Sequence, residues 1–393
     1  MLAPCATASD TQWLDLAALR AIESEWTVLI GRAIAPNVFY EPGFLLSAAA
    51  VFCPDAGAVT VRTKAGRLIG LFPMHRDQAR YGGYPAPVCG LVHPYGPLGA
   101  PLVDTEFAEM AIAGWLDHLC RTEHGAGAIL LPFFPQHGRL AALLDRAVTE
   151  RSLRQKHFNR HARAMLVRDR EAADERASVG MSKMRKEWRR QRRRLLERGP
   201  LEHRIATTPT ETGALLDVFL ALEAKGWKGH AGTAAAQNPG MLGFMRDAVV
   251  ALARAGQARI DVLRTDGQPV AATVTLFSKD EGWLWKIAFD EDFARFSPGV
   301  QLTLDVSGNL LADPRIARVD SCATPNHPMI DRLWPGRLAL SDRMIALRPG
   351  FDPRFAVACA LEAVRACALP SLRRARTGLR HVRIRRARAA TGE

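Results

Sequence analysis

The chain lacks the features of a disulfide-stabilised, zinc-binding or membrane-spanning protein. Its seven cysteines are scattered through 393 residues and no CxxC pair occurs, so we expect neither a disulfide framework nor a metal site. This use of cysteine is typical of a reducing compartment. No stretch approaches the roughly 18 consecutive apolar residues of a membrane-spanning helix. The first ten residues have no basic segment and no apolar core, which argues against a secretory signal. These absences predict a cytoplasmic protein.

Acidic residues are sparse in two segments that hold most of the basic charge. The net charge is +13. Residues 181–198 contain nine Lys or Arg against two Glu, and residues 373–388 contain eight Arg and no acid. The first segment could contact a polyanion such as tRNA, although nucleic acid is otherwise an unexpected partner, and the second could lie on an anionic membrane surface. A solvated helix and an unstructured basic tail are the respective alternatives.

Apolar periodicity and turn residues predict helices and strands in an order that is used twice. In the first half, helices are expected at 12–32, 41–52, 105–122 and 138–149, and strands at 58–63, 67–74, 87–92 and 128–134. In the second half, helices are expected at 181–198, 208–226, 238–256 and 299–312, strands at 201–207, 258–264, 269–278, 283–289 and 316–321, and a hairpin at 337–347. The pattern predicts an α/β (α+β) protein with domains 1–165 and 166–349, followed by a basic helical or disordered tail over 350–393.

The strand 283–289 leads through an acidic loop into a helix that begins at Ser297-Pro298-Gly299. The first-turn amides of a helix have no partners within it, and the helix dipole favours an anion there. Ser297 and Gly299 are therefore candidate phosphate-binding residues, and Arg295 could add a bidentate contact. An ordinary helix start with Pro in its first turn is the alternative.

Polar residues near the next strand are candidates for proton transfer. Asp320 ends the strand 316–321, and His327 has an ordinary pKa close to neutrality. A loop salt bridge and local hydrogen bonds are the respective alternatives. Asp290, directly after the strand 283–289, could orient an acceptor. Cys322 could be a nucleophile, but no base accompanies it in the sequence.

Three tryptophans lie near the predicted cleft. Trp283 and Trp285 share one face of a strand, and Trp227 ends a predicted helix. Core packing explains such residues, while a wall on which a substrate stacks is the alternative for Trp227 and Trp285. The alternation places Lys286 on the opposite face, where solvent is expected.

Five motifs follow one another between residues 10 and 347. They are Ala35–Pro42, the basic run RKEWRRQRRRLLERGPLEHRIA, Leu222–Gly229, Phe289-Asp290 with Phe293–Gly299, and Asp320 with Trp334. This set resembles the cellulose-biosynthesis-associated branch of the GNAT-like acetyltransferases, which shares a tandem arrangement with the Fem-type peptidyl transferases.

The resemblance implies a tandem GNAT-like fold with two mixed sheets flanked by helices. It also implies acetyl-CoA or another acyl-CoA as co-substrate, no metal, and an amine or hydroxyl acceptor on a sugar or exopolysaccharide precursor. A tRNA-dependent aminoacyl transferase of Fem type is one alternative function. A non-catalytic scaffold that docks a polysaccharide synthase at the inner face of the membrane is another.

Two departures from the family pattern stand out. The turn Phe296–Gly299 contains fewer Gly and Arg or Gln residues than the usual pyrophosphate loop. Many relatives place a Tyr-Lys pair before the tryptophan, where this chain has Met329–Arg332, so the role of that lysine is unfilled or has moved.

In the first half, a Gly/Pro-rich loop replaces the phosphate turn, so this half is expected to support the fold and wall the cleft.

Overall fold

The computed structural model describes residues 9–82, 87–123, 126–168, 181–206 and 208–368. The N-terminal half contains β1 Asp10–Asp15, α1 Leu16–Ala21, α2 Glu23–Arg32, η1 Val38–Tyr40, α3 Pro42–Phe52, β2 Gly57–Arg62, β3 Leu68–Arg76, β4 Val88–Gly90, β5 Leu102–Val103, α4 Ala108–Thr122, β6 Ala128–Pro135, α5 Arg139–Glu150 and β7 Gln155–Val167.

The C-terminal half contains α7 Met181–Leu196, β8 Leu201–Ile205, α8 Pro209–Lys225, α9 Trp227–His230, η2 Ala235–Gln237, α10 Pro239–Arg254, β9 Ala258–Thr265, β10 Gln268–Ser278, β11 Glu281–Phe289, η3 Glu291–Phe296, α11 Pro298–Ala312, β12 Arg318–Asp320, α12 Ile330–Leu333 and β13 Gly336–Ala346. A further helix covers 353–368.

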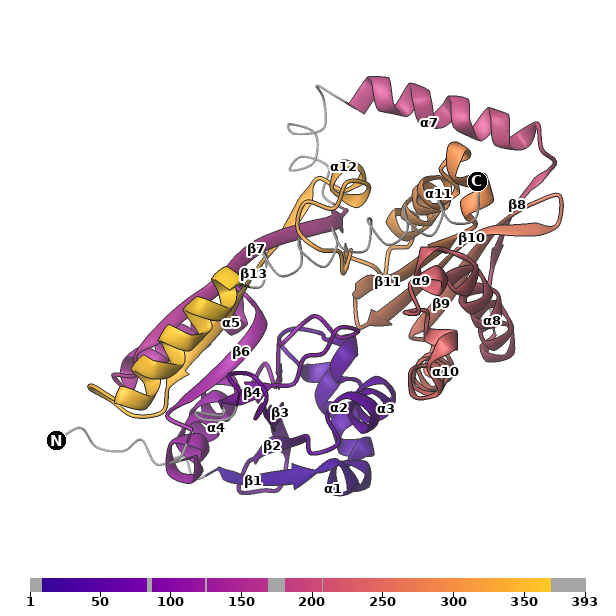
Figure 1. The fold of residues 1–393 in the computed structure, drawn as a ribbon. Helices are drawn as coiled ribbons and strands as arrows, with labels where there is room; N and C mark the ends of the chain where they lie inside the picture. The colour runs from indigo at the N-terminus through magenta and orange to yellow at the C-terminus, as the bar shows by residue number, and fades with distance from the viewer. Residues whose placement is uncertain (1–8, 83–86, 124–125, 169–180, 207, 369–393) are drawn as a thin grey trace.

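The two halves repeat one order of elements. Each runs through a strand, helices, antiparallel strands, a helix, a strand, a helix and a final strand, from β1 to β7 and again from β8 to β13 (Figure 1). The antiparallel strands are β2, β3 and β4 with the short β5 in the first half, and β9, β10 and β11 in the second. The capping box of α8, in which Thr208 and Glu211 bond reciprocally, shows how local sequence sets one of these boundaries. The predicted GNAT-like order of mixed α/β elements is confirmed.

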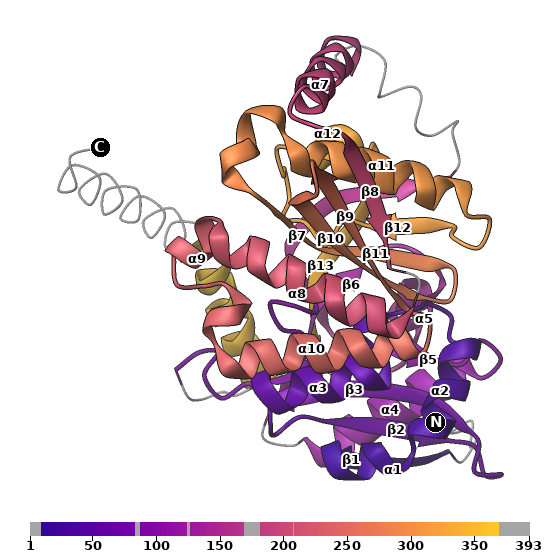
Figure 2. The ribbon, with the colours of Figure 1, turned by 90° about the vertical axis from the view of Figure 1, so that its right-hand side faces the viewer.

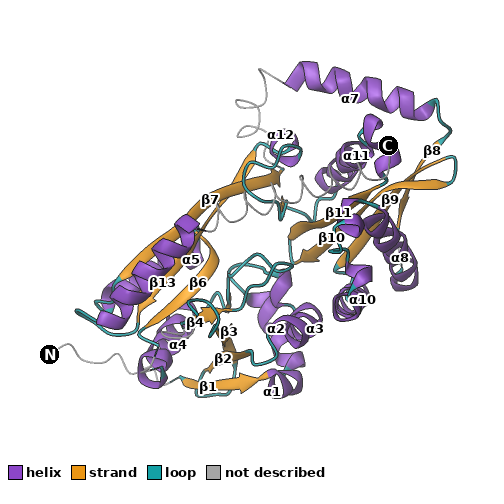
Figure 3. Cartoon of the chain, viewed as in Figure 1, coloured by secondary structure: helices purple, strands orange, loops and turns teal. Residues whose placement is uncertain are grey.

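The sheets of the two halves join into one 13-stranded sheet rather than the two sheets predicted from the sequence. The joining strands are exchanged, because β13 pairs with β6 of the N-terminal half while β7 pairs with β12 of the C-terminal half. β7 and β13 also pair with each other and cross between the halves (Figures 1 and 3). The predicted boundary at residue 165 lies inside β7, so the halves share strands there.

Three strands differ from the sequence prediction. β7 was not expected, because His, Arg and Lys interrupt the apolar alternation of Gln155–Val167 on both faces. β13 is one long strand where a hairpin was expected. β1 occupies the start of a predicted helix and pairs along its whole length with β2, so tertiary pairing outweighs local helical spacing there.

Helices α3 and α10 hold the two halves together at the side of the sheet (Figure 2). Gly43 makes the close approach possible, since a Cβ built on it would lie 2.7 Å from the Ala251 Cβ. Buried residues of both halves, from Leu19 to Leu347, form a single apolar cluster. The wall between the halves is therefore part of the core.

The helix 353–368, in the segment expected to be a basic helical or disordered tail, packs on the folded body. Its Phe355, Ala358 and Cys359 are buried against β6, β7 and β13. The arginine block 373–388 lies outside the described residues. Within the described residues, no helix is long and apolar enough to cross a membrane.

A buried ion pair anchors this helix. Both carboxylate oxygens of Glu362 accept bonds from Arg80 at 2.8 Å, and the Tyr81 hydroxyl donates a third bond at 2.8 Å. The Glu362 side chain is fully buried and that of Arg80 is 8% exposed. Burial raises the pKa of Glu362, but the bonds from Arg80 and Tyr81 outweigh it and leave the pKa below its ordinary value.

We expect Glu362→Gln to destabilise the protein by about 3–5 kcal/mol. The change removes the carboxylate that accepts both close bonds from Arg80 and, among the described residues, leaves the largely buried guanidinium only its 3.6 Å contact with Asp77. The measurement is the urea midpoint of unfolding. Glu150→Gln, which removes one partner of an exposed pair with Arg146, is the control and should leave the midpoint unchanged. Equal midpoints for both variants would show that the ion pair of Glu362 with Arg80 does not contribute to stability.

Candidate functional site

Strands β11 and β12 separate and leave a wedge between them. They pair in parallel only over Glu281–Trp283 and Arg318–Asp320, after which the β12 chain follows β7 instead, with Ser321 N–H donating to Ala164 O at 3.2 Å. A pocket of about 500 Å³ occupies the β11–β12 wedge and reaches the start of α11. The rest of β11 thus has an edge open to this pocket.

A β-bulge at Trp285 changes which side chains face the wedge. On β10, Val274 pairs with Lys286 and the next residue, Thr275, pairs with Leu284. Trp285 therefore has no partner, and the alternation shifts by one residue. Both Trp285 and Lys286 line the pocket. The prediction that Lys286 faces solvent on the opposite side is wrong, since that prediction assumed a regular strand.

The N-terminal half reaches the site through Tyr95, which contacts two of the lining residues. The Trp285 indole N–H donates to Tyr95 O at 2.6 Å, and the Lys286 Nζ lies 3.8 Å from the centroid of the Tyr95 ring. Asn37 and Tyr40 hold the loop that carries Tyr95 by bonds to Leu98 O, Ala100 O and Leu91 O. The described lining of the pocket contains no residue of the N-terminal half, so the expectation that this half walls the cleft stays a prediction.

The turn before α11 lies at the other end of the pocket. Ser297 has a left-handed backbone (φ 51°, ψ 53°), and its side chain does not cap the helix. Ser297 and Gly299 line the pocket, as a phosphate site requires. A Cβ on Gly299 would lie 3.4 Å from Ile287 Cδ1 and 3.5 Å from Phe289 Cδ1. Arg295 is exposed, rests on the Phe296 ring and is not among the lining residues.

Asp320 lies at the apex of the wedge but is held in a buried ion pair. Both its oxygens bond to Arg163, Oδ1 to Nε at 2.7 Å and Oδ2 to Nη2, and Oδ1 also accepts from Cys322 N–H at 3.0 Å. The exposed fractions of the two side chains are 4% and 1%. A carboxylate with both oxygens so occupied is not a free general base, so the structure gives Asp320 a structural role.

His327 and Cys322 line the pocket without offering a base or a nucleophile. The His327 Nδ1 accepts from Met329 N–H at 3.3 Å and Ile330 N–H at 3.4 Å, so a neutral ring carries its proton on Nε2 and presents a donor. Burial raises the pKa of the Cys322 thiol well above its ordinary value, which disfavours the thiolate.

Asp290 is a structural residue as well. It caps η3 by accepting from Asp292 N–H at 3.1 Å, and it pairs with the Lys225 ammonium at 2.8 Å. Its carboxylate is buried outside the pocket lining, so the predicted role in orienting an acceptor is not supported. Trp227 lies at the pocket rim with 57% of its surface exposed.

The described lining of this pocket contains no carboxylate and two lysines, Lys228 and Lys286. Lys228 pairs with Glu223 at 2.5 Å, whereas among the residues that the structure describes Lys286 has only the Tyr95 and Trp285 rings as close partners. Burial, helped by the Lys228 charge, lowers the pKa of Lys286 to about 8. Sequence reasoning missed Lys286 and Tyr95, because neither a bulge nor a contact between the halves has a signal in the sequence.

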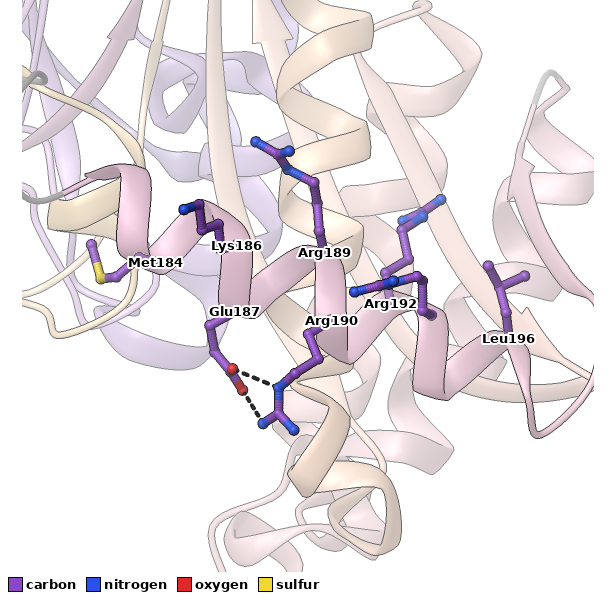
Figure 4. A pocket seen from close by; sticks show the side chains of 8 residues that line it. Met184, Lys186, Glu187, Arg189, Arg190, Arg192 and Leu196 are labelled. Carbon is purple, nitrogen blue, oxygen red and sulfur yellow. Dashed lines mark hydrogen bonds and ion pairs between the residues drawn. The ribbon is translucent and has the colours of Figure 1, made fainter.

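The helix α7 lies beside this site. It packs on α11 through Gln301, whose amide donates to Trp188 O at 3.0 Å, and through the Arg192–Asp305 ion pair at 3.0 Å. Charged side chains project from several sides of this helix, and of these Glu187 and Arg190 pair with each other (Figure 4). Arg189 and Arg193 are exposed on this helix.

Comparisons with known proteins agree with the fold. Residues 182–327 match the family model of the acetyltransferase (GNAT) domain. The C-terminal domain of a candidate lysylphosphatidylglycerol synthetase from Agrobacterium fabrum is 12% identical, with a TM-score of 0.55 over 89% of this chain and 96% of that one. A search of curated proteins found no match.

Two further solved structures have a similar fold. A conserved protein of unknown function from Bacteroides thetaiotaomicron is 13% identical, with a TM-score of 0.53 over 87% of this chain and 100% of that one. FemX is 11% identical, with a TM-score of 0.51 over 86% and 96%. At such identities the likeness concerns the fold alone. The chain therefore has a GNAT-like fold, and the segment that matches the GNAT domain contains the wedge.

We expect Asp320→Asn to lower the free energy of unfolding by about 3–5 kcal/mol, since it leaves the Arg163 charge buried and unpaired. Asp313→Asn, in an exposed pair with Arg315, is the control. The double variant Arg163→Met/Asp320→Leu should recover stability, because both charges are then absent. A stable Asp320→Asn protein would instead return Asp320 to the list of candidate bases.

Proposed function

We propose that the chain transfers an acyl group from coenzyme A to an amine or hydroxyl. The observation that carries this proposal is the β11–β12 wedge, which connects an uncapped helix start to a bulged strand edge and has no carboxylate in its described lining. The match of residues 182–327 to the GNAT domain supports the same chemistry.

The donor would bind with its pyrophosphate at the start of α11. Pro298 has no N–H, so the amides of Gly299 and Val300 are the first donors of this helix, and both residues line the pocket. The dipole of a 15-residue helix favours an anion there. The open edge of β11 beyond Trp283 supplies backbone groups that an extended amide chain can pair with.

The thioester would lie near the bulge. Trp285 has no residue opposite it in the register with β10, and a backbone N–H at such a bulge could stabilise negative charge that develops on a carbonyl oxygen. His327, with its proton on Nε2, is a second donor in the pocket. The chain thus offers donors for carbonyl polarisation without a metal, in line with the acyl-CoA chemistry expected from the sequence.

The acceptor enters past the exposed Trp227 and the Lys228 side of the pocket. We keep a sugar or exopolysaccharide precursor as the first class to test, because the resemblance to the cellulose-associated branch suggests it. The aromatic surfaces of Trp227 and Trp285 suit stacking of a sugar ring. Contact of residues 373–388 with a membrane also stays a proposal, since these residues lie outside the described part of the chain.

A tRNA-dependent aminoacyl transferase is the second candidate, favoured by the row of arginines on α7 beside the wedge. If tRNA binds there, Arg189→Gln/Arg193→Gln should weaken binding of bulk tRNA and reduce the slope of log K against log salt by roughly 0.7–0.9 per lost contact. Arg146→Gln on α5 is the control. An unchanged salt slope in the double variant would remove α7 from nucleic-acid binding.

For the leading function, we expect millimolar acetyl-CoA to raise the melting temperature of the wild type, because it binds only the folded state. Gly299→Val should weaken binding about tenfold or more, since its methyl groups cannot fit against Ile287 and Phe289 and must extend into the pocket. Gly308→Val, on the exposed part of the same helix, is the control. Absence of any shift in the wild type would contradict the donor site.

A further inference from the structure

The titratable side chains that line the wedge differ in whether they can accept a proton. Lys228 is committed to Glu223, the Cys322 thiol is held protonated, and His327 directs its lone pair at backbone amides. Asp320, just behind the lining, is occupied by Arg163. The remaining titratable side chain is Lys286, which has no carboxylate within ion-pair distance among the described residues.

The position of Lys286 follows from the bulge. The shifted alternation turns its side chain toward the wedge beside Trp285, and the ammonium lies against the Tyr95 ring at 3.8 Å and the Trp285 ring at 5.5 Å from their centroids. Aromatic faces attract a cation, but they offset the hydration energy that a buried ammonium loses less than a carboxylate would. The site therefore tolerates both the charged and the neutral amine.

We propose that Lys286 takes the proton from the acceptor during acyl transfer. This inference rests on the proposed acyltransferase function. An acceptor ammonium gives one proton to the neutral Lys286 amine, and its nitrogen then attacks the thioester carbonyl carbon. The nitrogen–carbon bond forms, the carbon–sulfur bond breaks, and the surplus proton on the attacking nitrogen goes to the thiolate. Lys286 afterwards loses its proton to water.

The charges around Lys286 agree with such a role. Burial and the Lys228 charge lower its pKa to about 8, while Glu223 and Cys322 oppose this shift. His93, which also faces Lys286, is kept neutral because burial lowers its pKa to about 3. The neutral amine is then a substantial fraction near pH 8, whereas a solvated lysine, with a pKa near 10.4, is almost fully charged there.

The first test measures the titration of the lysine side chains by NMR, with the lysines labelled at Cε. We expect one resonance with a midpoint near pH 8 that is missing in Lys286→Gln. Lys228→Gln should move this midpoint upward, because it removes a nearby positive charge and frees Glu223. A Lys286 midpoint above about 10 overturns the proposal, whether or not the protein is an acyltransferase.

The second test follows thiol release from acetyl-CoA with an amino sugar, an amino-acid amide and a polyamine as acceptors. The wild-type rate should rise with pH and level off above about 8. Lys286→Gln should reduce it by roughly 10²-fold or more and abolish that rise. Lys286→Arg keeps the charge but cannot accept a proton, so it should be equally impaired, and a fully active arginine variant overturns the proposal.

Two failures can be told apart. If acetyl-CoA does not stabilise the wild type, the proposed function fails and the NMR titration alone decides the state of Lys286. If acetyl-CoA stabilises both the wild type and Lys286→Gln, and both transfer equally well, the donor site stands and the inference about Lys286 fails.

Discussion

The buried ion pair between Arg163 and Asp320 connects the parts on which the site depends. Arg163 belongs to β7, the strand that the N-terminal half contributes to the sheet of the C-terminal half, and Asp320 ends β12 where the wedge opens. The same guanidinium donates to Pro97 O at 2.9 Å in the loop that carries Tyr95. One buried charge pair therefore connects the exchanged strand, the apex of the wedge and the loop that carries Tyr95, and loss of either partner leaves an uncompensated charge at their junction.

The bulge at Trp285 is the second constraint. In a regular strand Trp285 and Lys286 would face opposite sides, and a lysine facing away from the wedge could not reach a bound acceptor. The unpaired residue turns both side chains to the pocket and frees the Trp285 backbone from the ladder with β10. A single extra residue thus places an aromatic side chain and an amine together at the pocket side of β11.

The sequence predicted elements whose signal is local. The capping residues of α8, the apolar run of β6 and the turn at Ser297–Gly299 all have such signals, and the structure contains each of them. The exchange of β7 and β13 was not predicted, since basic residues mask the alternation of β7. The structural role of Asp320 was not predicted either, because its partner Arg163 is distant in sequence. The amino-acid sequence around Trp285 also contains no signal for a bulge.

The two halves use the same geometry for different purposes. In the N-terminal half, β4 and β6 pair in parallel only at Val88–Ile129 and Cys89–Leu130 before they separate, which repeats the arrangement of β11 and β12. There the opening is filled by the chain itself, because Gly99 N–H donates to Phe133 O at 3.2 Å and a Cβ on Gly99 would lie 2.1 Å from Pro132 O. The filled opening leaves no room for a donor, and the loop that fills it places Tyr95 over Lys286. The loop that fills the opening in the N-terminal half thus packs against two lining residues of the other half, Trp285 and Lys286.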